Sequence, residues 1–234
     1  MNIRFAVCGL FLSAGLLSSC TKKNGENQNL DPNNNQTFDI MSTKSGSWWL
    51  YNADDGSVFY RYATDKDTSK DAILYKYYYR IDTTSRLREQ IPEFFGKNSG
   101  KYISLIDLDG KQKNYITYVI LKEGAYVGQS WDNTERRKIE GVNVDMLIES
   151  EVKSVSDVLV LNGHPYDSVI HVYNNLKAKI VGTPLYTDCG DLDVWFRIGV
   201  GILKENGNID ISPAGVSLLS KTYKDYLLEY HVEP

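Results

Sequence analysis

The segment "GVNVDMLIESEV", residues 141–152, decides the fold class. Its apolar residues alternate with polar ones, so that Val142, Val144, Met146, Ile148 and Val152 stand against Asn143, Asp145, Glu149 and Glu151. A period of two is typical of a β-strand with one buried face. The segment "DLDVWFRIGVGIL", residues 191–203, has the same alternation, with Leu192, Val194, Phe196, Ile198, Val200 and Ile202 on one face. We predict a strand at each segment.

The rest of the chain has the composition of further strands joined by tight turns. Strands are expected over 47–53, 57–63, 72–81, 101–108, 113–121, 153–161, 167–176 and 216–232. Turns are expected at pairs whose residues tolerate positive φ: Asp55-Gly56, Asp109-Gly110, Glu123-Gly124, Asn162-Gly163 and Asn206-Gly207. The best helix candidate is "SRLREQIPEFF", residues 85–95, and Pro92 interrupts it. The sequence therefore predicts an all-β fold, an antiparallel meander.

About ten hairpin-linked strands are many for one open sheet, which tends to curl, close or split into two layers. We expect a strongly curved sheet, half-barrel or barrel, with a two-layer β-sandwich as the alternative. The concave face of such a sheet can be filled by side chains or can hold a ligand. The alternation of apolar and polar residues is compatible with a filled concave face and with a ligand cavity.

The N-terminus, "MNIRFAVCGLFLSAGLLSSC", has the layout of a secretory signal, with Arg4 before an apolar stretch too short for a stable membrane span. It ends in Leu17-Ser18-Ser19-Cys20, which resembles the lipobox of bacterial lipoproteins. The resemblance implies a signal peptide over 1–19, diacylation of the Cys20 thiol and acylation of the new amino terminus. Two or three acyl chains, at about 0.8 kcal/mol per buried CH2, anchor a protein durably. A plain secretory signal with an incidental cysteine is the alternative.

A polar segment, "TKKNGENQNLDPNNNQ", follows Cys20 and has one aliphatic residue. We predict that residues 20–36 form a lipidated N-terminus and a flexible tether with an r.m.s. span of about 20–25 Å. Residues 37–234 contain no second segment of this kind, so a single β-rich domain is expected there. Thr21 differs from the aspartate associated with inner-membrane retention, which favours the outer membrane of a bacterial cell envelope.

The charge of the chain argues against one class of partner, and its cysteine content limits disulfide and thiol chemistry. The chain has 30 acidic and 26 basic residues, a net charge of −4, and no basic run, which argues against nucleic acid. With Cys8 removed and Cys20 acylated, Cys189 is the one remaining thiol and cannot form an intramolecular disulfide. No histidine or basic residue lies near it in "YTDCGDLD" to lower its pKa. We expect Cys189 to be a small buried or half-buried residue.

Three segments carry a family resemblance: "GQSWDN" at 128–133, "LVLNGHPYDSVIHV" at 159–172 and "WFRIGVGILKENG" at 195–207. With the Leu- and Tyr-rich C-terminal strand, they resemble a group of uncharacterised bacterial lipoproteins. In that group a G-x-x-W step precedes a sheet, a glycine hairpin follows, and a G-V-G-aliphatic-aliphatic-K motif begins a strand. The likeness covers roughly 46–232 and implies an architecture without an activity. The hairpin Gly163-His164-Pro165-Tyr166 departs from the small residues with Phe or Tyr that are common there.

The G-V-G motif also has a direct physical interpretation. Gly199 and Gly201 fall on one face of the predicted strand, where missing side chains permit a sharp bend in a curved sheet. The motif is no phosphate-binding loop, because it lacks the G-x-G-x-x-G continuation into a helix.

Residues that could carry chemistry are few and scattered. Of the three histidines, His164, His171 and His231, the first two lie seven residues apart on one predicted strand, so they point to opposite faces and cannot easily share a metal. Carboxylates cluster at Asp188, Asp191 and Asp193, and again at Asp65, Asp67 and Asp71. Asp191 and Asp193 share one face of their predicted strand, so a carboxylate pair for acid/base chemistry or Ca²⁺ binding is conceivable. However, "DCGDLD" lacks the glycine turn and the terminal glutamate of a calcium loop, and solvated charge on the outer face of a strand explains it better. No G-x-S-x-G motif occurs. We predict no catalytic residue, no metal and no cofactor.

Aromatic residues are unusually frequent, with 17 Tyr, 7 Phe and 4 Trp. In "YKYYYRI", Tyr75, Tyr77, Tyr79 and Ile81 share one face, and Lys76, Tyr78 and Arg80 share the other. Trp48 and Trp49 point to opposite faces. Sheet packing accounts for most of these residues, and outward ones could stack on sugar rings or on a partner protein.

Three functions follow as hypotheses. The first is a non-enzymatic, membrane-anchored envelope lipoprotein that binds or carries an apolar ligand, such as a lipid, or a partner protein. The second is a glycan-binding surface lipoprotein of a nutrient-uptake system. The third, an enzyme, would need convergent polar groups with shifted pKa values in one cleft.

Overall fold

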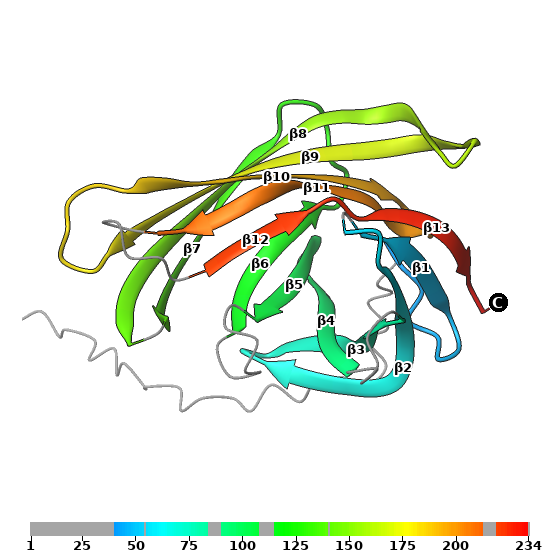
Figure 1. The fold of residues 1–234 in the computed structure, drawn as a ribbon, viewed down its shortest axis with the longest axis horizontal. Helices are drawn as coiled ribbons and strands as arrows, with labels where there is room; N and C mark the ends of the chain where they lie inside the picture. Colours follow the sequence, from blue (N-terminus) through cyan, green and yellow to red (C-terminus); the bar gives the residue numbers. More distant parts are fainter. Residues whose placement is uncertain are drawn as a thin grey trace, which may run out of the picture. The chain divides into compact units, whose positions relative to one another are not determined.

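The computed structural model describes residues 40–53, 55–83, 90–107, 115–139, 141–212 and 219–233. All belong to the compact unit Asn35–Pro234. They form 13 strands of one antiparallel sheet and no helix, which confirms the all-β meander (Figure 1). In this described part, no helix is long and apolar enough to cross a membrane. The predicted signal peptide, Cys20 and the tether lie outside the described residues.

The strands follow one another around the sheet nearly in chain order. Their bounds are β1 (Trp48–Asn52), β2 (Val58–Lys70), β3 (Ile73–Asp82), β4 (Gln90–Asn98), β5 (Lys101–Asp107), β6 (Tyr115–Lys122), β7 (Ser130–Ile139), β8 (Val142–Leu161), β9 (His164–Ile180), β10 (Thr187–Arg197), β11 (Gly201–Ile211), β12 (Leu219–Tyr223) and β13 (Tyr226–His231). The order across the sheet is β6-β5-β4-β3-β2-β1-β13-β11-β10-β9-β8-β7, and β12 pairs with β11. The ends of the folded unit therefore meet at the β1–β13 ladder.

The sheet curls until its two outer strands, β6 and β7, lie side by side, so it is a nearly closed barrel (Figure 1). Side chains make this last junction. Alternate residues of β7 bond the backbone of β6: Trp131 Nε1 donates to Val119 O (2.9 Å), Val119 N donates to Asn133 Oδ1 (3.1 Å), Thr117 N donates to Glu135 Oε1 (3.3 Å) and Arg137 Nε donates to Tyr115 O (3.1 Å). We call this junction the side-chain seam. It satisfies edge groups of β6 that would otherwise pair with another strand.

Large aromatic side chains fill much of the interior. Trp49, Tyr51 and Phe59 are buried, as the alternation around "WW" requires. Their polar atoms have partners: Trp49 Nε1 donates to Val200 O (2.6 Å) and the Tyr51 hydroxyl donates to Ile202 O (2.9 Å). These bonds join β1 to the region of β11 across the interior. The indole and phenol groups are therefore buried without an unsatisfied donor.

The best helix candidate, residues 85–95, is not helical where the structure describes it. From Gln90 onward the chain forms β4, between β3 and β5. Phe94 and Phe95 are both buried, one on each face of the sheet, which removes the alternation that would have revealed a strand. Pro92 is tolerated because β4 pairs there with β3 alone, the β4–β5 ladder beginning at Phe94.

The segment 191–203 was predicted as one strand and is a hairpin. β10 ends at Arg197, and Val200 N donates to Arg197 O at 3.0 Å to close the turn. Gly199 and Gly201 have φ values of +81° and +113°, so they permit a reversal here instead of the predicted bend. The prediction was wrong because apolar residues happen to keep a period of two through the turn.

The pair Asn206-Gly207 was predicted as a turn and lies inside β11. A Cβ atom at Gly207 would lie 2.2 Å from Asp191 O on β10. The glycine therefore permits a close approach of two strands rather than a reversal.

The other predicted turns and strand boundaries agree with the structure in part. Turns at Asp55-Gly56, Glu123-Gly124 and Asn162-Gly163 are confirmed, and Asp109-Gly110 lies outside the described residues. The strands predicted over 141–152 and 153–161 are one strand, β8, and the strand predicted over 216–232 is interrupted between β12 and β13. β7 was not predicted, because side chains committed to the seam give it polar residues on both faces.

Candidate functional site

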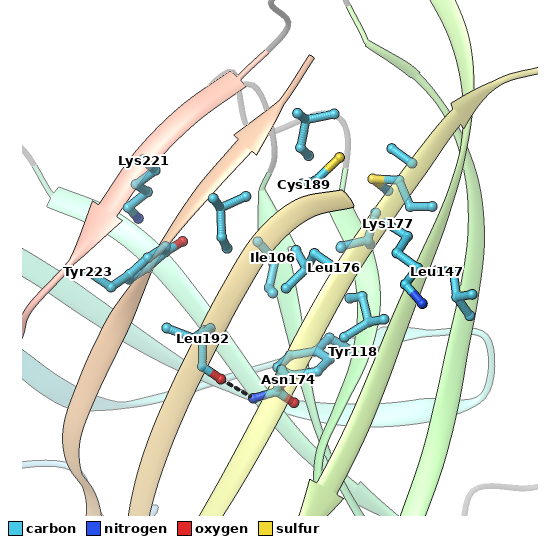
Figure 2. Close-up of a pocket in the computed structure, with 16 residues that line it drawn as sticks. Ile106, Tyr118, Leu147, Asn174, Leu176, Lys177, Cys189, Leu192, Lys221 and Tyr223 are labelled. Carbon is cyan, nitrogen blue, oxygen red and sulfur yellow. Dashed lines mark hydrogen bonds between the residues drawn. The ribbon is translucent and has the colours of Figure 1, made fainter. Parts of the chain in front are cut away.

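Two adjoining cavities lie inside the sheet. The first, which we call the aliphatic chamber, has a volume of about 90 Å³. Its lining is mostly apolar and includes Ile106, Ile116, Tyr118, Met146, Ile148, Asn174, Leu176, Ala178, Cys189, Leu192, Ile209, Ile211, Lys221 and Tyr223. Figure 2 shows Leu176 and Cys189 facing this chamber, with Lys221 and Tyr223 to one side.

The second cavity, the charged chamber, has a volume of about 380 Å³. It combines apolar side chains with eight ionisable ones: Arg61, Arg80, Asp82, Glu93, Tyr118, Glu205, Lys221 and Tyr223. Both chambers share Ile106, Tyr118, Leu192, Lys221 and Tyr223. The concave face is therefore partly filled and partly hollow, with an apolar part beside a polar one.

Two strands carry arginine into the interior. On β2, Arg61 is in phase with Phe59 and Ala63, and all three are buried. On β3, Arg80 is in phase with Tyr78, so the predicted Lys76, Tyr78 and Arg80 face is the inner one near the chamber. The sequence analysis did not predict either arginine as an interior residue. The signal that could have done so is that each arginine alternates in phase with the apolar residues of its strand.

Arg61 is fully committed to protein partners. Its Nε and Nη2 atoms donate to the Glu93 carboxylate, Nη2 at 3.3 Å, and Nη1 donates to the Tyr51 hydroxyl at 3.1 Å. Burial is the largest single effect and opposes both charges. The mutual attraction of Arg61 and Glu93, their hydrogen bonds and other nearby charged groups together outweigh it, so the pKa of Arg61 is raised and the pKa of Glu93 is lowered. The pair links β2 to β4 across β3.

Arg80 is also engaged. Its guanidinium lies 3.5 Å from the centroid of the Phe59 ring, and Nη1 lies 3.5 Å from Asp225 Oδ2. Burial raises the pKa of Asp225 in spite of this cation. One face of Arg80 is thus covered by an aromatic ring, and its charge is shared with a carboxylate.

Glu205 differs from the other carboxylates of the charged chamber. None of the described residues donates a hydrogen bond to its side chain. Burial raises the pKa of Glu205, and repulsion from Asp225 and Glu93 adds to that effect against the attraction of Arg61 and Lys221. The fold therefore brings a carboxylate to the cavity without giving it a partner.

A β-bulge turns Glu205 inward. Trp195 of β10 is opposite Lys204, whereas the next residue of β10 is opposite Ile202, so Leu203 is an extra residue in β11. Ile202 and Leu203 are both buried, and the alternation resumes one residue out of phase. Without the bulge Lys204 would face the interior. The sequence carries no signal for this shift, so Glu205 could not be predicted.

Lys221 and Tyr223 reach both chambers from β12. Lys221 Nζ lies 4.4 Å from the centroid of the Tyr223 ring, and burial raises the pKa of Tyr223. Among the described strands, β12 pairs with β11 alone. The other possible neighbour, β1, ends its pairing with β13 at Asn52 and Tyr226 and does not continue along β12. β12 is therefore a wall segment with a strand on one side.

A buried polar network lies where the chambers meet. The Tyr118 hydroxyl donates to Asn174 Oδ1 at 2.5 Å, and Asn174 Nδ2 donates to Leu192 O at 2.9 Å (Figure 2). Burial raises the pKa of Tyr118, so the phenol stays neutral. Its oxygen can still accept a hydrogen bond from a guest molecule.

Cys189 is buried in the wall of the aliphatic chamber, which confirms the prediction of a small buried residue. Burial raises the pKa of its thiol, and the nearby Asp210 and Asp188 raise it further. A thiol with a raised pKa is a poor nucleophile and a poor metal ligand.

None of the three histidines lines either chamber. His171 lies on the outer face, where Nε2 is 2.6 Å from Asp193 Oδ1 and the ring stacks on Trp195 with centroids 4.5 Å apart. Asp191 shares the outer face of β10 with Asp193, as predicted.

The second carboxylate cluster lies along β2 and the turn after it. Asp65 and Asp71 are exposed, and Asp67 pairs with Lys76 at 2.7 Å. In the described parts of the chain, no three His, Cys, Asp or Glu side chains are grouped so that they could hold a metal ion.

Outward aromatic residues pack mainly on one another. Tyr77 contacts Tyr79 and Phe94, with ring centroids 4.9 and 4.7 Å apart. Trp48, on the face opposite to Trp49 as predicted, contacts Tyr60 at 5.7 Å. These edge-to-face contacts stabilise the sheet and cover part of each ring.

Comparisons with protein-family models, with curated proteins and with solved structures gave no match to this chain. The resemblance to the group of bacterial lipoproteins stays a prediction, and the site is interpreted from its own chemistry.

Proposed function

We propose that the protein is a membrane-anchored envelope lipoprotein whose barrel binds a small apolar or amphipathic molecule without transforming it. One observation carries this proposal: the two adjoining chambers inside the sheet, of about 90 and 380 Å³. Small-molecule sites are typically concave, about 300–1,000 Å³ in volume, largely apolar and furnished with a few polar groups. The lipobox at Cys20 supports the anchored state.

Binding is favoured over catalysis by the composition of the chambers. Ser57 and Ser104 line the charged chamber, but the histidines lie elsewhere and Cys189 has a raised pKa. An activated nucleophile needs a base within hydrogen-bond reach. Glu205 and Asp225 have the raised pKa of a catalytic acid, but among the described residues neither is paired with a nucleophile.

The glycan-binding hypothesis rests on the outward aromatic residues. Trp48 and Tyr60 are partly exposed on the face of β1 and β2. Because their edges and faces are used in contacts with other rings, we favour the interior as the ligand site. Loss of glycan affinity on Trp48→Ala would support the alternative.

The proposal is tested with a chain that begins at residue 21, which keeps the whole compact unit and lacks acyl chains that would compete for the cavity. We expect the fluorescence of phenylnaphthylamine to rise on binding, and native mass spectrometry to detect a co-purifying small molecule. Cys189 is the one cysteine of this chain. Occupancy of the aliphatic chamber should therefore slow its reaction with N-ethylmaleimide.

A matched pair of variants locates the binding. Ala178 is buried in the lining of the aliphatic chamber, whereas Lys179 is the next residue and lies on the other face of β9. Ala178→Phe should weaken phenylnaphthylamine binding by about ten-fold or more, and Lys179→Phe should not. Equal binding by both folded variants, with no protection of Cys189, would refute the interior site.

A further inference from the structure

We infer that the molecule bound in the barrel is an amphipathic amine, whose ammonium group is held by Glu205 while its apolar part occupies the aliphatic chamber. This inference rests on the proposed function and adds the class of ligand. The geometry behind it is an unpaired carboxylate in a chamber that adjoins an apolar one.

The arginines of the charged chamber are not available to an anionic head group. Arg61 uses Nε and Nη2 on Glu93 and Nη1 on Tyr51. Arg80 shares its charge with Asp225 and covers its face with Phe59. A carboxylate ligand held by either arginine would have to break one of these pairs, which leaves a buried charge without its partner.

The charge balance also disfavours an anion. The described residues in and beside the chamber supply four carboxylates, Asp82, Glu93, Glu205 and Asp225, and three cations, Arg61, Arg80 and Lys221. A fatty acid would add a fifth carboxylate to this set. An ammonium group would instead bring the balance to zero.

Glu205 is the group that a cation would satisfy. No described side chain donates to it, and burial together with Asp225 and Glu93 disfavours its charged form. A ligand ammonium would remove this penalty and gain a charge-assisted hydrogen bond. The Tyr118 hydroxyl, which lines both chambers, offers a second acceptor on the way to the aliphatic chamber.

Lys221 is the cation that could compete for Glu205. It is exposed, its ammonium lies over the Tyr223 ring at 4.4 Å, and it comes from a strand with a neighbour on one side. An exposed lysine keeps its hydration at little cost, so it can yield Glu205 to a ligand that also buries an alkyl chain.

The test compares three probes with one chain length: dodecylamine, dodecanol and dodecanoate. Each displaces phenylnaphthylamine from the chain that begins at residue 21. We expect dodecylamine to bind about ten-fold more tightly than dodecanoate, with dodecanol between them. Glu205→Gln should weaken dodecylamine binding by about ten-fold and leave dodecanol unchanged. Glu205→Asp should retain the preference for dodecylamine over dodecanoate. Glu229 is an exposed carboxylate on β13, so Glu229→Gln should behave as the wild type.

The outcomes separate the two proposals. If no probe binds, dodecanol included, the interior binding function fails. If the probes bind but dodecanoate is equal to or tighter than dodecylamine, the function stands and the amine is refuted. The amine is equally refuted if Glu205→Gln, with a thermal unfolding curve that shows a folded protein, keeps the wild-type ratio of dodecylamine to dodecanoate affinity.

Discussion

At the scale of single residues, two half-buried glutamates of the charged chamber have opposite effects on the folded state. Glu93 is paired with Arg61, and its pKa is lowered from the ordinary value of 4.5. The pKa of Glu205 is raised from the same value because it is buried without a partner. A lowered pKa stabilises the fold above the unfolded pKa, and this contribution is lost as the pH falls through the folded pKa. A raised pKa stabilises the fold below the unfolded pKa, and its contribution is lost as the pH rises.

Glu93→Gln should therefore destabilise the protein at neutral pH by about 3 kcal/mol, since it leaves the Arg61 charge buried alone. The loss should shrink at an acidic pH below the lowered pKa of Glu93, where the wild-type side chain carries a proton. Urea unfolding at both pH values measures the difference. A loss of equal size at both would show that the ion pair does not act through its charge.

Glu205→Gln should have the opposite effect at neutral pH and stabilise the empty protein by roughly 1 kcal/mol. The gain should vanish at about pH 3, where the wild-type carboxyl is already neutral. A residue that costs stability in the empty state is expected at a binding site. A destabilised Glu205→Gln at neutral pH would mean that the fold itself needs this charge.

At the scale of elements, the seam between β6 and β7 closes the barrel with side chains in place of a backbone ladder. Asn133 accepts from Val119 N and Trp131 donates to Val119 O, so two residues satisfy both backbone groups of a third. Alternate residues of β7 can do this because they all point to the same side of their strand.

Asn133→Ala should cost about 1–3 kcal/mol, because it leaves the Val119 N–H without an acceptor. Thr134→Ala is the matched control, since Thr134 is exposed and points away from the seam. Its cost should stay within about 0.5 kcal/mol. Denaturant unfolding gives both values. Equal stabilities would show that water replaces the Asn133 contact without loss.

The sequence predicted elements well where one face is buried and poorly elsewhere. β8 follows from strict alternation, and the turn at Asn162-Gly163 follows from its residue types. β4 is buried on both faces and β7 is polar on both, so neither shows a period of two. The β10–β11 turn is hidden because its apolar residues stay in phase. The apolar–polar pattern of one strand does not show where the strand paired with it ends.

At the scale of the whole molecule, the curvature was predictable and the chambers were not. Many short hairpins imply a curled sheet. The lining, however, gathers side chains from β2 to β6 and from β8 to β12, and one bulge decides that Glu205 rather than Lys204 faces inward. Such a site depends on register between distant strands, which a sequence pattern does not specify.

The predicted lipid anchor at Cys20 also concerns the whole molecule, since it would place the barrel at a membrane. Protein purified from membranes should yield an N-terminal tryptic peptide, Cys20 to Lys22, that carries two or three acyl chains by mass spectrometry. Cys20→Ala should abolish this acylation, and Cys189→Ala should leave it intact. An unmodified Cys20, or a mature chain that begins before it, would contradict the lipoprotein assignment.

The β1–β13 ladder sets a condition on how the chain is made. β13 lies between β1 and β11, so the wall joins its first strand to its last. The hairpins β2–β3 and β8–β9 can form from nearby sequence alone, but the barrel can close only after Tyr226–His231 is available to pair with β1 and β11. Until then the future interior stays open to water, and long-range pairing of this kind is slow to form. A transcript truncated before β13 would therefore encode a protein with most of its strands and no enclosed cavity.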